Sequence, residues 1–104
     1  MGTNKRYAAS VDRQMDKRVN ESIMRGTAPV TLTDKELELD VEPLTRAPTP
    51  RPVLAWVRYG EIPLQVEAQA VAWTAYAVAI RWPAADGESH RAWVWAAAVR
   101  GTGA

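Results

Sequence analysis

In the second half of the chain, apolar and polar residues alternate in short runs, a pattern typical of β-strands with one buried face. The runs cover residues 53–59, 64–73, 77–82 and 90–96, and turn residues separate them. The strongest hairpin signal is Asp86-Gly87. The stretch AAAVR at the end of the last run predicts a short helical turn. A flat sheet this small would expose its edges, so the pattern predicts a closed, SH3-like antiparallel β-barrel of four or five strands.

The tryptophans are the natural candidates for the core of this barrel. The chain has five Trp and no Phe, and many of its other apolar residues are alanines, which bury little surface. Trp93 and Trp95 lie on one face of the last strand and, with Trp73 and Trp82, are predicted to fill the interior. Trp56 or Trp93 is the expected surface exception.

Residues 1–28 predict an amphipathic, basic helix. Its apolar stripe recurs at every fourth residue: Tyr7, Val11, Met15, Val19 and Ile23. Gly26 stands where a C-terminal cap is expected. Arg6, Arg13 and Lys17 fall opposite the stripe. We interpret that basic face as the solvated side of a docked helix, with a weak phosphate-binding ridge as the alternative.

Residues 29–42 are acidic and carry two conflicting local patterns. Thr33 and Glu36 have the spacing of a capping box, and Leu32 and Leu37 that of a hydrophobic staple. The alternation over residues 37–42 is instead typical of a strand. We favour a short capped helix from Asp34 to about residue 40.

A proline-rich segment follows, with prolines at positions 43, 48, 50 and 52. Proline removes a backbone donor, so this segment is predicted to be neither helix nor interior strand but an extended linker. The stretch PTPRP also has the composition of a ligand for SH3-type domains, although an extended connector is the favoured interpretation. The chain is thus predicted in three parts, residues 1–28, 29–52 and 53–104, and its fold class is α+β.

Residues with catalytic chemistry are sparse. There is no cysteine, His90 is the only histidine, and the six glycines form no phosphate-binding loop. Asp12 and Asp16 lie one helical turn apart but have no further ligand at metal-site spacing. We therefore expect no enzymatic activity, cofactor, metal or small-molecule substrate. No segment has the apolar length of a membrane span, and a cytoplasmic protein is expected.

Four stretches carry a resemblance at the level of the whole chain: NKRYAASVDRQMDKRV, PVLAWVRYG, AVAWTAYAVAIRW and HRAWVWAAAV. With them the chain resembles short uncharacterised proteins of actinobacteria and their phages. The resemblance implies no particular activity.

Two functional hypotheses follow. The first is a non-catalytic protein-interaction module, such as an accessory or structural component of a phage or mobile element, that binds a partner or itself. Its candidate contact residues are the helical stripe and Trp56. The second is a nucleic-acid-binding barrel, in which arginines on strands would combine charge with stacking. Its candidate residues are Arg58, Arg81, Arg91, Trp56 and Trp93. A formal net charge of +1 and the acidic block argue against the second.

Overall fold

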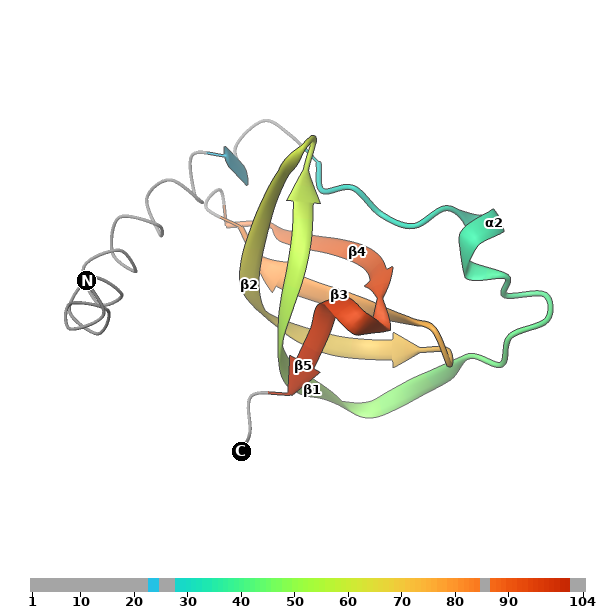
Figure 1. The fold of residues 1–104 in the computed structure, drawn as a ribbon. Helices are drawn as coiled ribbons and strands as arrows, with labels where there is room; N and C mark the ends of the chain where they lie inside the picture. Colours follow the sequence, from blue (N-terminus) through green and yellow to red (C-terminus); the bar gives the residue numbers. More distant parts are fainter. Residues whose placement is uncertain (1–22, 25–27, 85–86, 102–104) are drawn as a thin grey trace, which may run out of the picture.

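The computed structural model describes residues 23–24, 28–84 and 87–101. They form a five-stranded antiparallel sheet (Figure 1). The strands are β1 (Thr45–Tyr59), β2 (Ile62–Trp73), β3 (Ala77–Pro83), β4 (Ser89–Trp95) and β5 (Val99–Gly101), in the spatial order β4-β3-β2-β1-β5. Two short helices, α2 (Asp34–Leu37) and the 3-10 helix η2 (Ala96–Ala98), complete the described elements. The predicted strands and the helical turn after β4 are confirmed, whereas β5 was not predicted.

The first strand begins well before the predicted boundary at Val53. Of residues 45–52, predicted as a linker, Thr45, Arg46, Arg51 and Pro52 pair with the end of β2, and residues 47–50 lie in a register shift between the two pairs. Pro48 and Pro50 are tolerated because they lie in this register shift, outside the ladder with β2, and Pro52 because β5 pairs only with Val53, Leu54 and Ala55. The linker prediction was therefore wrong for these residues.

The sheet is strongly bent, so that β3 and β4 cross the upright part of β1 (Figure 1). A second register shift, between Ala70 and Ala72, marks the bend in β2. Among the described residues no strand ladder joins β4 to β1 or β5, which stand at the other end of the sheet. The expected closed barrel is thus not formed. The architecture is an open, bent sheet.

A short segment, residues 28–33, bridges β1 and β4, and we call it the strap. The Val30 amide donates to the Arg58 carbonyl oxygen at 2.7 Å, and the Leu32 amide donates to the Trp93 carbonyl oxygen at 3.0 Å. In return, the Trp93 amide donates to the Thr31 hydroxyl at 2.8 Å. The strap thereby satisfies backbone groups on two strand edges that do not pair with each other.

The capping box that begins α2 is confirmed. The Thr33 side chain accepts from the Glu36 amide at 3.2 Å, and the Thr33 amide donates to Glu36 Oε1 at 2.9 Å. The helix is shorter than predicted because Glu38 adopts a left-handed conformation, with φ of 51°, and closes it. Residues 38–42 form a turn and a bend, and not the alternative strand.

The core lies on the inner face of the bent sheet and consists mainly of small aliphatic side chains, with Tyr59 and Trp82 as its aromatic members. Only Trp82, 2% exposed, is a fully buried tryptophan among the five. Trp73 and Trp93 are half-buried, and Trp95 is exposed. The prediction of a tryptophan-filled interior was therefore wrong. A sheet this small has little inner volume, which alanine and valine fill without the strain that more large rings would cause.

The predicted N-terminal helix falls mostly outside the described residues, and so do Tyr7, Val11, Met15 and Val19. Ile23 is described, and it packs against the core beside the buried Met24. In the predicted Asp86-Gly87 turn, Asp86 lies outside the described residues, while Gly87 has a φ of 83° that favours glycine.

Candidate functional site

One surface hollow is an aromatic groove of about 490 Å³ between the strap, β1 and β4. Its walls come from three separate parts of the chain. The lining residues are Val30, Thr31, Leu32, Glu36, Trp56, Val57, Arg58, Pro63, Trp93, Val94, Trp95 and Ala98. The groove lies where the strap spans from β1 to β4 through its hydrogen bonds to Arg58 and Trp93. It therefore depends on tertiary structure and not on any local motif.

Three tryptophans give this groove its character. Trp56 is 52% exposed and Trp95 is 45% exposed, and Trp93 is half-buried between them along the lining. Burying an aromatic ring contributes more free energy than burying most other side chains, so exposed rings in one hollow leave unused binding energy. The prediction that Trp56 is exposed is confirmed, and Trp95 is a groove residue that sequence reasoning missed.

The alternation of side chains between the two faces of β4 explains why Trp95 was not predicted to line the groove. The sequence correctly places Trp93 and Trp95 on one face of β4 and Ala92 and Val94 on the other. The structure buries Ala92 and Val94, opposite Ile80 and Val78 of β3. Because both faces of β4 are apolar, alternation alone does not indicate which face is inside. The available signal was the partner strand, whose inner face already carries Trp82.

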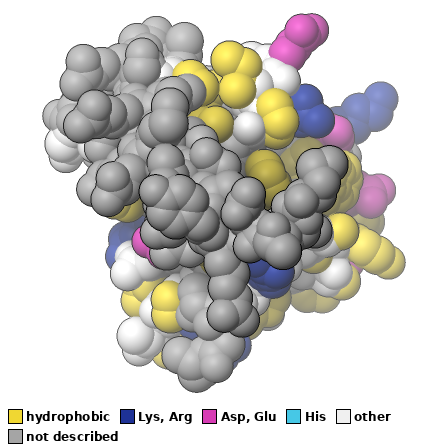
Figure 2. All heavy atoms as spheres, turned by 60° about the vertical axis from the view of Figure 1, so that its left-hand side comes forward, with side chains coloured by type: hydrophobic (Ala, Val, Ile, Leu, Met, Phe, Trp, Pro, Cys, Tyr) yellow, Lys and Arg dark blue, Asp and Glu magenta, His cyan; other side chains and the backbone are white. Residues whose placement is uncertain are grey.

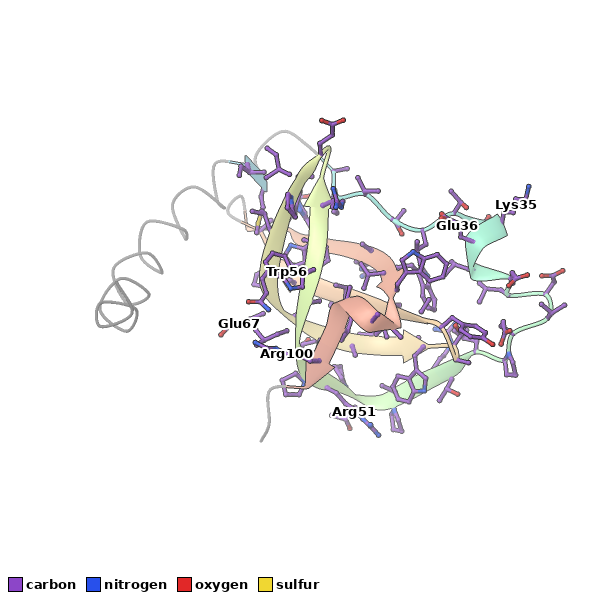
Figure 3. The ribbon with its side chains drawn as sticks, in the orientation of Figure 1. Lys35, Glu36, Arg51, Trp56, Glu67 and Arg100 are labelled. Atoms are coloured by element: carbon purple, nitrogen blue, oxygen red, sulfur yellow. The ribbon has the colours of Figure 1, made fainter. Side chains whose placement is uncertain are left out.

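The groove has one fixed acidic group on its α2 side. Glu36 Oε1 accepts hydrogen bonds from the Thr33 amide at 2.9 Å and the Thr33 hydroxyl at 3.1 Å. The capping box thus holds this carboxylate at the groove, and exposed Asp34 and Glu38 lie beside it in the chain. Of the described residues in the lining, Arg58 on β1 is the one with a cationic side chain. In Figure 3 Glu36 lies on the α2 side of the molecule and Trp56 on the β1 side.

A second hollow of about 390 Å³ adjoins the first, between β1, η2 and β5. It is lined by Leu54, Trp56, Gln65, Ala97, Ala98, Val99 and Arg100. Trp56 and Ala98 line both hollows, so the Trp56 side chain stands between them. Figure 3 shows Trp56 and Arg100 on this side of the sheet, with Glu67 near them.

The structure divides the nucleic-acid candidates into two groups. Trp56, Arg58 and Trp93 meet at the groove. Arg81 and Arg91 lie directly opposite each other on β3 and β4. Arg81 Nε donates to Gln69 Oε1 at 3.1 Å, which orients its guanidinium. On the face shown in Figure 2, basic and acidic side chains are interspersed among hydrophobic ones.

The single histidine lies in a ring cluster at the edge of the core. The Trp82 indole N–H donates to the Tyr59 hydroxyl at 3.0 Å, and that hydroxyl lies 2.7 Å from His90 Nδ1. Because Tyr59 accepts from Trp82, its own O–H can donate to Nδ1 in the tautomer in which that nitrogen carries no hydrogen. These bonds join β1, β3 and β4, so we interpret the cluster as a structural link. The described residues hold no group of three or more side chains arranged to bind a metal ion.

No protein-family model matches the chain, and no curated protein or solved structure matches it either. None of the helices in the described part of the chain has the length and apolar character needed to cross a membrane.

Proposed function

We propose that this protein is a non-catalytic interaction module that binds an extended peptide segment of a partner protein in the aromatic groove. The observation that carries the proposal is the placement of Trp56 and Trp95, each about half exposed (52% and 45%), in one hollow. Aromatic anchors dominate the binding energy of protein interfaces when a partner covers them. Grooves lined by aromatic rings are also a recurrent way to bind extended peptides.

The charges around the groove select the chemistry of that peptide. Glu36 is held at the groove, and the neighbouring segment 34–42 carries five acidic residues against Lys35 alone. A peptide with apolar side chains for the rings and a lysine or arginine for Glu36 complements this surface.

Nucleic-acid binding is the second candidate function. It is favoured by the pair Arg81 and Arg91, which stand opposite each other on β3 and β4 with Trp93 further along β4. Like charges directly opposite on neighbouring strands are destabilising, and an anion between them would relieve the repulsion. The acidic segment beside the groove would repel a phosphate backbone, so we rank this candidate second.

Selection from a display library of random peptides of about 12 residues tests the first proposal, because such peptides extend to about 40 Å. Wild-type protein is expected to enrich peptides that combine apolar residues with lysine or arginine. The selected peptides should bind Trp56→Ala and Trp95→Ala about tenfold more weakly or worse, a loss of about 1.4 kcal/mol.

The matched control is Tyr76→Ala, because Tyr76 is 60% exposed and lies outside the groove lining. It should leave peptide affinity unchanged, and thermal melts should show that all variants fold. Equal losses in all three variants, or no enrichment, would contradict the proposal. Salt-dependent binding of an oligodeoxythymidine of about 20 nucleotides, lost in Arg91→Ala, would instead favour the second candidate.

A further inference from the structure

We propose that the second hollow is a carboxylate-binding subsite, which takes an aspartate or glutamate side chain of the same extended peptide. This inference rests on the proposed function and adds to it where the basic and the acidic residue of the bound peptide lie. The bound peptide would present its basic residue to Glu36 on the α2 side and its acidic residue to Arg100 on the β5 side.

The two hollows are placed so that one peptide crosses both. Both are bounded by β1, whose outward-facing residues are Leu54, Trp56 and Arg58. Leu54 lines the second hollow, Arg58 lines the first, and Trp56 lines both. Four residues of strand separate Leu54 from Arg58, or about 13 Å, so an extended peptide of about four to six residues spans the distance. Its central apolar side chain would cover Trp56.

The lining of the second hollow has the chemistry for a carboxylate. Among the described residues its hydrogen-bonding side chains are Arg100, Gln65 and the indole of Trp56, all able to donate, and none of these lining residues is a carboxylate. Arg100 is exposed and lies opposite Leu54 on β5, and Gln65 lies opposite Trp56 on β2. The two donor side chains therefore flank β1 from its two sides. An arginine can bind a carboxylate with two parallel hydrogen bonds.

An acidic side chain, Glu67, also lies near this subsite and offsets part of the positive charge of Arg100. Glu67 pairs with Leu54 from the β2 side, so Leu54 lies between Glu67 and Arg100 in the sheet. Two strand spacings amount to about 10 Å between the backbones, and Figure 3 shows Glu67 and Arg100 on the same side of the sheet. A peptide carboxylate that enters from the η2 side meets Arg100 first, because η2 contributes Ala97 and Ala98 to the same hollow. Their small side chains leave that approach open.

The test uses the peptides that wild-type protein selects, synthesised with acetylated and amidated ends so that no terminal carboxylate is present. Each is made with its acidic residue and with the matching amide, Glu to Gln or Asp to Asn. Arg100→Ala is expected to weaken the acidic peptide about tenfold and the amide peptide less than about twofold. Repeating the selection with Arg100→Glu should replace the acidic preference with a basic one.

The matched control is Arg46→Ala, which removes another exposed arginine of the sheet that lines neither hollow. Equal weakening of acidic and amide peptides by Arg100→Ala would overturn the subsite while leaving the groove intact. The subsite would also be overturned if Arg100→Ala weakened the binding of selected peptides only when they carry a free C-terminal carboxylate. If wild-type protein enriches no peptide over Trp56→Ala, the proposed function itself fails. The two failures are thus distinguishable.

Discussion

The inner and outer faces of the sheet use tryptophan in opposite ways. On the inner face, Trp82 is 2% exposed and its indole N–H is bonded to the Tyr59 hydroxyl. On the outer face, Trp56 and Trp95 are about half exposed, at 52% and 45%, and line a hollow. The ring chemistry is the same, but one tryptophan stabilises the fold and the others leave apolar surface for a partner.

The comparison teaches that a small sheet limits how much of its aromatic content it can bury. The inner face is filled chiefly by alanine, valine and leucine around one indole and one phenol. The inner face has no volume for further rings. Trp56, Trp93 and Trp95 instead gather at the groove between the two strand edges that the strap bridges. We infer that the outer rings can be changed with less effect on folding than the inner one.

The largest expected effect is on stability, from Trp82→Ala. Removing a buried tryptophan should lower the free energy of unfolding by about 3–5 kcal/mol, much of the stability of a domain this size. Trp56→Ala should cost less than half as much, because about half of that side chain (52%) is already exposed. Urea unfolding followed by circular dichroism measures both. Similar losses for the two variants would break the distinction between the faces.

An intermediate effect is expected from Tyr59→Phe. The change removes the hydroxyl that bonds both the Trp82 indole and His90, leaving polar groups at the core without their partner. The free energy of unfolding should fall by about 1–3 kcal/mol. Tyr76→Phe is the matched control, because Tyr76 is 60% exposed, and it should unfold like the wild type. If the free energy of unfolding fell in Tyr76→Phe but not in Tyr59→Phe, the ring cluster would add no stability.

The smallest stability effect is expected from Thr33→Ala, which removes the N-cap of α2. Loss of a capping side chain costs about 1 kcal/mol. It also removes the hydroxyl bond to Glu36 Oε1 and leaves only the backbone amide bond, so the preference of selected peptides for lysine or arginine should weaken. Peptide binding and urea unfolding, measured on the same variant, separate the two effects. A stable variant with an unchanged preference would mean that Glu36 needs no positioning.

Much of the fold is predictable from the sequence because its determinants are local. Alternation located the strands, and the end of β1 at Gly60 follows from the left-handed φ of 65° that its turn requires. The Thr33 and Glu36 spacing predicted the helix start correctly. The start of β1 was missed because proline is excluded from interior strands but not from an open edge, and the edge exists only once β2 pairs there.

The candidate site was only partly predictable. Trp56, Arg58 and Trp93 were named as possible contact residues, and all three line the groove. Trp95, Glu36 and Arg100 were not, since their roles depend on neighbours that are distant in the chain. The strap residues lie far in sequence from Trp93, to which they are bonded.

By itself, the sequence determined which residues share a face of each strand and where the chain turns. The strand period of two and the conformations of glycine and capping residues are both set within a few bonds. Tertiary structure alone decided which face of β4 points inward, that the sheet stays open, and that two hollows form around Trp56. Those outcomes depend on the inner volume of the bent sheet and on which edges lie opposite each other, and neither is encoded within a single strand.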